Sequence, residues 1–491
     1  MRVSLSAFWS VCAFAAAVAV TPATGQSFEF GPPDTSVRPP AAKPKPPAAQ
    51  PNAAAKPVDQ GSIAAPAAVG TQHLEPAPQK PKAAGTEAAT SPPPVAAAYK
   101  YSSTNQLPPK PAPANCKTVG TFEGWMAAFR KEVTAEGLSP AAISEVLDGL
   151  TFDPSVISRD RKQGVFQLSF LDFSDKLATK NRMQTGRAKI AQNKAVFDRV
   201  QKQFGTPAPV IAAFWALESD FGTGMGKLPI LRSIASLAYD CRRGPMFREE
   251  LKAVIRIVER GDMSPAEMVG SWAGEIGQTQ FLPTRFLEHA IDYDGDGKVN
   301  LFRSDADIIG TTANYMNHLG WRPNEPWLEE VVVPGTLPWD QADLAVKHPR
   351  SQWGKWGVIR PDGSALQADG LTASLLLPMG RFGPAFLAYQ NFDMYVKWNQ
   401  SLTYTLTAAF LATRIDGAGP MQRGRPGIQM LSPDEAKELQ RQLAKRGFDV
   451  GEIDGKIGSA TRTAVKAMQI KYGQPADSFP TPELLAALRG G

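Results

Sequence analysis

The feature that most limits what this chain can fold into is a long proline-rich stretch near its N-terminus. Residues 26–115 contain 20 of the 43 prolines, mixed with Ala, Lys, Gln and Thr and with very few large apolar side chains. Such a composition buries too little apolar surface to offset the entropy lost on ordering. We therefore expect residues 26–115 to be a disordered linker with some polyproline II character, and the folded domains to lie in the remainder of the 491 residues.

An export signal is predicted for residues 1–25. A positively charged start is followed by an apolar run from Phe8 to Val20, and Ala23-Thr24-Gly25 offers a small-residue cleavage site. The run is too short to span a bilayer, and no later segment resembles a membrane helix. Cys12 would suggest lipid attachment, but Trp9-Ser10-Val11 before it lack the small residues of that signal. We expect a soluble, exported protein.

Helical patterns dominate residues 116–416. Apolar residues recur at helical spacing over 247–260, and 209–217 is apolar nearly all round, which is typical of a buried helix. Further helices are predicted over 311–319 and 403–413, and short strands over 330–333 and 374–377. The sequence thus predicts a mainly α domain with a little β structure.

A second linker and a small helical domain are predicted at the C-terminal end. Residues 417–431 are rich in Gly and Pro, and 432–489 form the domain. Ser-Pro-Asp-Glu at 432–435 combines an N-cap, a proline at the first helical position and a capping-box glutamate. A second helix is predicted over 459–472 and a third from Thr481. Three short helices make a minimal independent domain.

Several kinds of chemistry are excluded by what the sequence lacks. The four histidines are scattered, so no zinc pair of the His-x-x-x-His or His-Glu type occurs. There is no Gly-x-Ser-x-Gly elbow and no phosphate-binding Gly-x-x-x-x-Gly-Lys. The net charge of +6 suits an anionic surface, but no long Lys/Arg block favours nucleic acid as a partner. Carboxylates are therefore the best candidates for catalysis.

Glu218 is the most unusual carboxylate in the chain. It ends the apolar run 212–217 and precedes the Gly-rich stretch 221–224. Charged residues are almost never fully buried unless they are paired, so the position calls for a reason. An apolar surround would raise the pKa of this carboxyl, which suits a general acid near neutral pH. Alternatively, Glu218 ends the helix and points to solvent, and the pattern alone leaves both interpretations open.

Four blocks of sequence, in order, carry a family resemblance. They are Ala-Leu-Glu-Ser-Asp-Phe-Gly (216–222), Gly-Ser-Trp-Ala-Gly-Glu-Ile-Gly-Gln-Thr-Gln-Phe-Leu-Pro-Thr (270–284), Ala313-Asn314-Tyr315 with Gly320-Trp321, and Trp398-Asn399-Gln400-Ser401 through Tyr404. Together they resemble the lytic murein transglycosylase B enzymes over roughly residues 117–415. The resemblance implies a lysozyme-like α (α+β) catalytic domain, peptidoglycan glycan strands as the partner, a periplasmic monomer, and no cofactor required for catalysis.

Carried over residue by residue, the resemblance implies that Glu218 is the single catalytic acid/base. It also implies that five residues line the sugar-binding groove: Ser271, Gln280, Tyr315, Trp398 and Tyr404. The family usually has Tyr where Trp398 stands, and without the resemblance Tyr315 and Trp398 fit core positions better than sugar-binding ones. Glu275 would suggest a hydrolase with two carboxylates, but the family does not require an acid there.

The mechanism that the resemblance implies needs one carboxyl group. Glu218 protonates the oxygen between N-acetylmuramic acid and N-acetylglucosamine and then removes the proton from the muramic C6 hydroxyl, which attacks the anomeric carbon. The product is 1,6-anhydromuramic acid, unlike the products of most glycosidases. Two alternatives remain: a hydrolytic muramidase with water as the acceptor, and a wall-binding scaffold whose Glu218 is inactive.

Residues 292–300 fit the first half of an EF-hand calcium loop. The carboxylates of Asp292, Asp294 and Asp296 stand at positions one, three and five, and Lys298 offers its backbone carbonyl. Position twelve is Arg303 and not glutamate. The resembled family closes a variant loop with a later acid, here Asp307 or, less favoured, Asp305. A structural Ca²⁺ site is predicted, with an Asp/Gly-rich turn that binds no metal as the alternative.

The C-terminal module resembles peptidoglycan-binding domain 1. The residues that carry this resemblance are Leu439-Gln440, Leu443, Gly447, Gly451, Asp454-Gly455, Gly458, Thr461, Ala464-Val465 and Gln469. The resemblance implies a three-helix domain that binds the bacterial wall. The alternative is a helical module with another partner.

The cysteines predict one disulfide. Removal of the export signal would leave Cys116 and Cys241 as an even pair in an exported protein, and an oxidising compartment favours their bridging. The alternative is two small buried side chains that lie too far apart to bond.

Overall fold

The structure of the protein, a computed structural model, describes residues 112, 116–161, 168–425 and 428–490. The predicted export signal and almost all of the predicted proline-rich linker lie outside the described residues. Within the described ranges, no helix is both long and apolar enough to cross a membrane.

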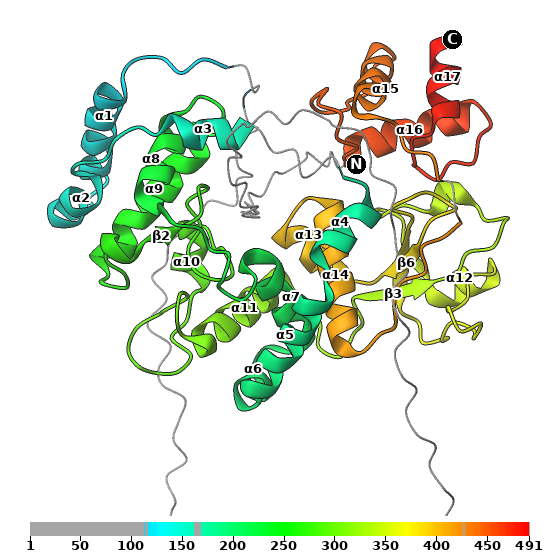
Figure 1. Ribbon diagram of the computed structural model, residues 1–491, viewed down its shortest axis with the longest axis horizontal. Helices are drawn as coiled ribbons and strands as arrows, with labels where there is room; N and C mark the ends of the chain where they lie inside the picture. The colour runs from blue at the N-terminus through cyan, green and yellow to red at the C-terminus, as the bar shows by residue number, and fades with distance from the viewer. Residues whose placement is uncertain (1–111, 113–115, 162–167, 426–427, 491) are drawn as a thin grey trace, which may run out of the picture. The chain divides into compact units, whose positions relative to one another are not determined.

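Most of the described chain is helical, as predicted (Figure 1). The helices of the large domain are α1 (Phe122–Ala135), α2 (Pro140–Leu147), α3 (Pro154–Arg161), α4 (Phe170–Leu177), α5 (Lys180–Gln192), α6 (Lys194–Phe204), α7 (Ala208–Ser219), α8 (Ile230–Tyr239), α9 (Gly244–Glu259), α10 (Pro283–His289), α11 (Asp305–Leu319), α12 (Arg350–Lys355), α13 (Phe392–Trp398) and α14 (Leu402–Asp416). The four helices that we predicted in this domain correspond to α7, α9, α11 and α14.

Short polar side chains begin many of these helices. The hydroxyl oxygen of the residue before the helix accepts a hydrogen bond from a backbone N–H of the first turn, which satisfies one of the donors left open there. The capping residues are Thr121, Ser139, Ser169, Thr179, Ser304 and Ser401. Ser401 thereby fixes the start of α14, the helix that carries Tyr404.

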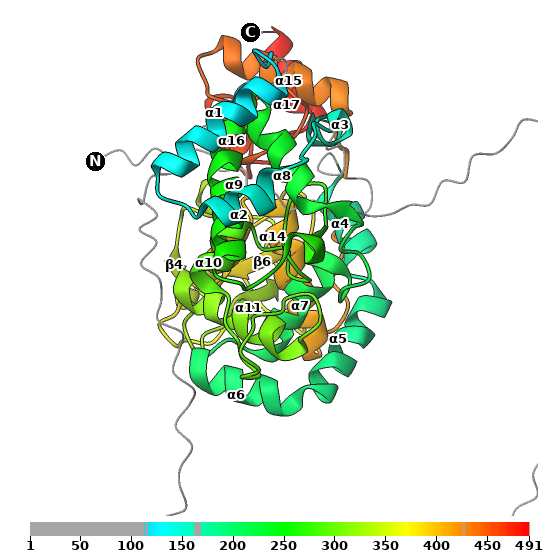
Figure 2. The same ribbon diagram turned by 90° about the vertical axis from the view of Figure 1, so that its left-hand side faces the viewer.

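Helix α7 is the buried helix of the large domain. Its residues from Val210 to Ser219 are all buried, which explains why the sequence of this helix is apolar nearly all round. Helices α5, α11 and α14 pack around it (Figures 1 and 2). The polar end of a helix in this position must be satisfied by neighbouring side chains.

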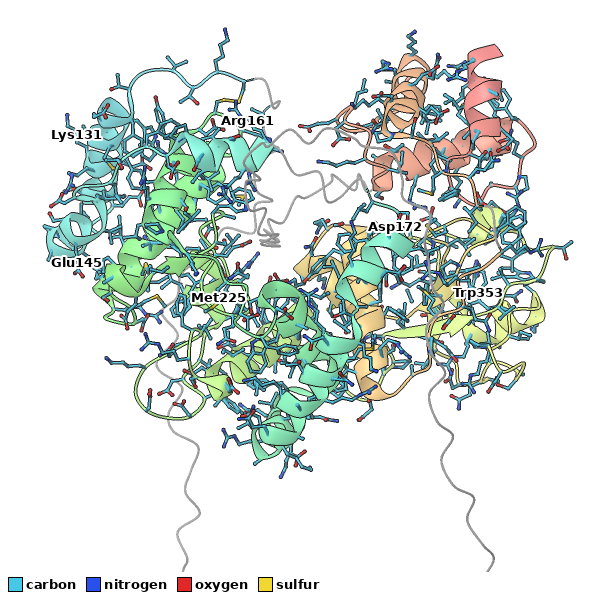
Figure 3. All side chains as sticks on the ribbon, in the orientation of Figure 1. Lys131, Glu145, Arg161, Asp172, Met225 and Trp353 are labelled. Carbon is cyan, nitrogen blue, oxygen red and sulfur yellow. A yellow bond between two sulfur atoms is a disulfide. The ribbon has the colours of Figure 1, made fainter. Side chains whose placement is uncertain are left out.

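Two antiparallel sheets complete the large domain. Strands β3 (Leu328–Val331), β4 (His348–Pro349), β5 (Thr372–Leu376) and β6 (Ala385–Ala388) form a sheet in the order β3-β6-β5-β4. The predicted strands correspond to β3 and β5, each displaced toward the C-terminus by one or two residues, whereas β4 and β6 were not predicted. Trp353 of α12 packs in this part of the domain (Figure 3), and its indole N–H donates to the carbonyl of Ala373 at 2.9 Å.

The smaller sheet links two segments of the predicted site. Strand β1 (Leu228–Pro229) follows the turn after α7, and β2 (Val269–Gly270) leads into the segment 270–284. The two strands pair antiparallel, with Leu228 opposite Gly270. This pairing joins the end of the Glu218 helix to the second block of the resemblance.

The C-terminal module contains three helices with their own apolar core, as predicted. They are α15 (Pro433–Lys445), α16 (Ser459–Lys471) and α17 (Pro482–Gly490). Ser432 and Glu435 form the predicted capping box. Gln440 is buried, donates to the carbonyls of Glu452 and Lys456, and accepts from the N–H of Gly455 at 2.8 Å. One amide side chain therefore holds the turn between α15 and α16.

The module contacts the large domain, and both fall within one compact unit. Asp477 accepts from the backbone N–H of Arg381 at 3.0 Å, and Lys466 pairs with Asp343 at 3.0 Å. The segment predicted as a second linker also contacts the large domain, because Arg423 binds both oxygens of Asp175 at 2.8 and 2.9 Å.

Candidate active site

A left-handed turn that starts two residues after Glu218, at Asp220, ends α7. Asp220 and Phe221 have φ angles of 51° and 55°, and Gly222 has 91°. Such angles are uncommon for residues with a Cβ and cost free energy, so the surroundings must hold them. Arg182 donates to the Asp220 carboxylate at 3.1 Å. A Cβ on Gly222 would lie 2.5 Å from the side-chain oxygen of Gln278, so this position requires glycine.

Glu218 lies at the buried end of this helix, with 6% of its surface exposed. The indole N–H of Trp398 donates to its Oε1 at 2.9 Å, and the hydroxyl of Tyr404 donates to the same oxygen. Trp398 ends α13 and Tyr404 lies in the first turn of α14. Two helices distant in sequence therefore fix the orientation of one carboxyl group, and the interpretation of Glu218 as a solvent-facing helix end is wrong.

Aromatic rings surround the Trp398 indole. Its ring centroid lies 4.2 Å from that of Phe214, 5.5 Å from Phe281 and 5.3 Å from Tyr315. Trp398 and Tyr315 are each 7% exposed. The structure thus brings two of the three predicted groove aromatics together, but as buried members of a packed row next to Glu218.

Ser271 and Gln280 are also buried, and their hydrogen bonds lie within the segment 270–284. The Ser271 hydroxyl donates to Glu275 at 3.0 Å, and the Gln280 amide donates to the carbonyl of Gly277 at 2.7 Å. Glu275 itself is fully buried. These contacts shape the segment, and none of them joins Ser271, Gln280 or Glu275 to Glu218.

Gln278 is a supporting residue that the sequence analysis did not single out. Its oxygen accepts from the indole N–H of Trp215 in α7 at 2.7 Å, and its amide donates to the carbonyl of Phe302 at 2.8 Å. It therefore ties the Glu218 helix to the end of the acidic loop. Trp215 could have indicated that such a residue exists, because a buried indole N–H needs an acceptor. The sequence alone does not say which residue supplies the acceptor.

A second buried glutamate, Glu250 of α9, supports the start of α10. Its two oxygens accept from the backbone N–H and the hydroxyl of Thr284 at 2.9 and 3.0 Å. Burial raises the pKa of this carboxyl to about 7, although the bonds from Thr284 oppose the shift. Glu250 thus caps, from another helix, the start of α10, which begins at Pro283 within the segment 270–284.

The acidic loop brings three carboxylates together. Oxygens of Asp292, Asp294 and Asp296 lie within 4.8 Å of one another. Backbone N–H groups of Gly295 and Gly297 donate to Asp292 at 2.7 and 2.8 Å. Convergent carboxylate oxygens are the ligands that Ca²⁺ prefers, so the residues present fit this ion.

The two acids considered for closing the loop have other partners. Asp307 is fully buried and accepts from the backbone N–H groups of Tyr293 and Asn300, both at 2.7 Å. Burial raises its pKa. Asp305 accepts from Lys189 and Asn193, both at 2.9 Å. Asp307 therefore braces the loop backbone, and the backbone N–H of Lys298 donates to Asp296 at 2.9 Å.

Cys116 and Cys241 form a disulfide, with their Cα atoms 6.0 Å apart. The bridge joins the start of the large domain to the residues after α8. Thr118 accepts from the N–H of Cys241 at 3.1 Å beside it. The alternative of two separated thiols is thus excluded in this structure.

A buried carboxyl in a largely apolar surround can stay protonated near neutral pH, as the general acid of glycan-cutting enzymes must. The comparisons agree with this class. Residues 121–413, more than half of the 491, match the family described as Transglycosylase SLT domain, and the chain belongs to this family. Residues 432–488 match the family described as Putative peptidoglycan binding domain.

Individual relatives support the same assignment. Membrane-bound lytic murein transglycosylase B of Escherichia coli (strain K12) is 28% identical over 241 residues, which are 48% of this chain and 65% of that protein. The chain thus spans less than two thirds of the length of this relative.

Solved structures match a larger share of the chain. SltB3 from Pseudomonas aeruginosa, in complexes with NAG-anhNAM-pentapeptide and with NAG-NAM-pentapeptide, is 38% identical with a TM-score of 0.71, over 76% of this chain and 100% of that one. The Escherichia coli lytic transglycosylase Slt35 in complex with calcium is 26% identical with a TM-score of 0.51, over 59% of this chain and 92% of that one.

Proposed function

We propose that the protein is a lytic transglycosylase that cleaves the β-1,4 bond between N-acetylmuramic acid and N-acetylglucosamine in peptidoglycan. The observation that carries this proposal is the buried carboxyl of Glu218, held by Trp398 and Tyr404 through one oxygen. The complex of SltB3 with an anhNAM ligand supports 1,6-anhydromuramic acid as the product.

The reaction needs two proton transfers at Glu218. The protonated carboxyl gives its proton to the glycosidic oxygen, the bond to the anomeric carbon breaks, and the N-acetyl group of the substrate helps to stabilise the developing positive charge. The resulting carboxylate takes the proton of the C6 hydroxyl, whose oxygen bonds to the anomeric carbon. Glu218 ends protonated as it began, and no water is consumed.

Trp398 and Tyr404 stabilise the Glu218 carboxylate that exists between these two steps. A carboxylate that accepts two hydrogen bonds is favoured over its protonated form. Glu218 is a carboxylate only after the first proton transfer, so the two donors stabilise it when it must serve as the base. That Trp398, Tyr404, Tyr315, Ser271 and Gln280 border the sugar stays a prediction, because all five side chains are buried in this structure.

The nearest alternative is a muramidase that uses water as the acceptor. Glu275 was the candidate for a second carboxylate in such an enzyme. That side chain is fully buried and accepts from the Ser271 hydroxyl. The mass of the products from purified glycan strands tests the proposal: anhydro ends are expected, reducing ends would indicate a hydrolase, and intact strands a scaffold.

The role of Glu218 has its own test. Glu218→Gln should lower turnover by about three orders of magnitude, because the only acid/base group is lost, while circular dichroism stays unchanged. Glu123→Gln, an exposed first-turn glutamate of α1, is the matched control and should cut glycans normally. Near-normal digestion by a folded Glu218→Gln enzyme would refute the assignment.

The remaining predictions concern location and metal. We propose that the protein is a monomer exported to the periplasm by its signal. The Cys116–Cys241 disulfide supports this location, since such bridges persist in oxidising compartments. A structural Ca²⁺ would be held by Asp292, Asp294 and Asp296 with the Lys298 carbonyl, while Asp307 accepts from backbone N–H groups and braces the loop. Slt35 in complex with calcium supports this choice of ion. Catalysis at Glu218 requires no metal.

A further inference from the structure

The aromatic row beside Glu218 continues to the surface through two imidazoles. The Tyr315 ring lies 5.3 Å from Trp398 and 4.9 Å from His289, and the rings of His289 and His318 are 4.3 Å apart. His318 is exposed, whereas His289 is 6% exposed. A contiguous series of rings therefore leads from the indole that binds Glu218 to a surface histidine.

Two permanent cations lie at this outer end. The guanidinium carbon of Arg285 is 5.7 Å from the centre of the Tyr315 ring, and the side chain is 47% exposed. Lys397 is exposed and donates to the carbonyl of Leu319, the last residue of α11. Burial lowers the pKa of His318, as do His289 and the two cations, whereas Glu288 opposes the shift. The four residues Arg285, His289, His318 and Lys397 are called the cationic edge below.

The cationic edge contains little compensating negative charge. Glu288 is 3.1 Å from Arg285 and 3.4 Å from His289, and the buried carboxyl of Glu250, whose pKa Arg285 lowers, is a second acidic group that acts on Arg285. Elsewhere in the domain a buried cation is fully compensated: Lys252 has carboxylate oxygens of Glu132, Glu136 and Glu249 within 3.2 Å. The excess of donors over acceptors at the cationic edge distinguishes it from such a structural cluster.

We propose that the cationic edge binds a carboxylate of the peptide stem carried by the muramic acid residue at the cleavage site. The inference rests on the proposed function and specifies which part of the wall polymer this site recognises. A guanidinium offers two parallel N–H groups to a carboxylate, and an imidazole adds a further donor even when it is uncharged. The stem is attached to the sugar whose bond is cut, so the proposal places one of its carboxylates at the outer end of the ring series that starts beside Glu218.

The test compares two substrates that differ only in the stem. Glycan strands with intact stems, and the same strands stripped of stems by an amidase, are cut by wild type, Arg285→Gln, Arg285→Lys and Lys202→Gln. Lys202 is an exposed lysine of α6 and controls for the loss of one charge.

Arg285→Gln should lower kcat/KM on stem-bearing strands about tenfold, the size of a lost charge-assisted hydrogen bond, and change it less than twofold on stripped strands. Arg285→Lys should fall between, because it keeps the charge but loses the planar fork. The difference should shrink in high salt, and Lys202→Gln should behave as wild type.

Binding gives a second measurement that does not depend on turnover. N-acetylmuramyl tripeptide, titrated into the Glu218→Gln protein, should bind more weakly when Arg285→Gln is added. An equal loss of kcat/KM on both substrates would mean that Arg285 only supports Tyr315, and unchanged rates on both would also overturn the inference. Failure of the wild type to cut either substrate would instead count against the proposed function.

Discussion

Trp398 stands where the resembled family usually has tyrosine, and its contacts explain how the site accommodates the change. The indole N–H reaches Oε1 of Glu218 at 2.9 Å while the ring stacks on Phe214 at 4.2 Å. A tyrosine hydroxyl could replace the donor but not the full stacking area. Because the Trp398 ring is mostly covered by other rings, we expect Trp398 to position Glu218.

Substitutions at Trp398 separate its hydrogen bond from its ring. Trp398→Phe removes the donor and should lower kcat by about ten- to a hundredfold with little change in KM, because a hydrogen bond to a charged group contributes about 1.5–3 kcal/mol. Trp398→Tyr keeps a donor and should retain most of the activity. Steady-state kinetics on soluble glycan fragments decides: equal loss in both variants would mean that ring packing, and not the N–H, is what matters.

Some of the site residues were predictable from local sequence patterns, and others were not. Glu218 was recognisable because one carboxyl ends an apolar helix. The partner of its carboxyl, Tyr404, came only from the resemblance, since a pair separated by 186 positions leaves no local pattern. Asp307 was proposed as a metal ligand, and the sequence could not show that backbone N–H groups occupy its oxygens.

At the level of elements, the helices with clear start and stop residues were predicted best. The capping box at Ser432 and the apolar character of α7 each correspond to an observed helix. Strand β6 was missed because all four of its residues are buried and show no alternation. Strand β4 is only two residues long, and its pairing with β5 depends on tertiary contacts.

Glu250, which supports the start of α10, should make the free energy of unfolding of the protein depend on pH. Its pKa is about 7 in the folded protein against about 4.5 when unfolded. Below pH 4.5 the carboxyl is protonated in both states. As the pH rises from 4.5 to 7, the unfolded state releases the proton while the folded state keeps it, so unfolding becomes more favourable and stability is lost. The free energy of unfolding of wild type, relative to Glu250→Gln, should fall by about 3 kcal/mol over this range.

Denaturant titrations of both proteins between pH 4 and pH 8 measure this difference. Glu123→Gln, which changes an exposed glutamate, should show the same pH dependence as wild type. If wild type and Glu250→Gln have parallel stability profiles across this range, Glu250 does not carry the proton in the folded state.

The acidic loop offers a second prediction at this scale. Ca²⁺ should raise the melting temperature, because an ion bound only by the folded state stabilises it, and removal of one carboxylate by Asp294→Ala should abolish the gain. Asp434→Asn, in the first turn of α15, is the control and should respond like wild type. A wild-type melting curve that millimolar Ca²⁺ leaves unchanged would identify the loop as a turn without metal.

For the whole molecule, the contacts of the C-terminal module change how it is expected to work. A short linker was predicted between the domains, and Arg423 of this segment binds Asp175, while Lys466 of the module pairs with Asp343. Asp477 also accepts from the backbone of Arg381. The module would then bring the wall to the active site from a docked position, and its chief effect would still be to raise the local concentration of substrate.

The last prediction tests that effect. A protein that ends after residue 427 should cut short soluble glycans within about twofold of the full-length rate, because Glu218, Trp398 and Tyr404 remain, and its melting curve verifies that the large domain stays folded. Its retention on insoluble wall sacculi should fall at least about tenfold, since one of two linked binding surfaces is lost. Lys466→Gln is the control: it removes the ion pair with Asp343 but keeps the module, so it should sediment with sacculi like the full-length protein. Equal sedimentation of the truncated and full-length proteins would show that the module does not hold the enzyme on the wall.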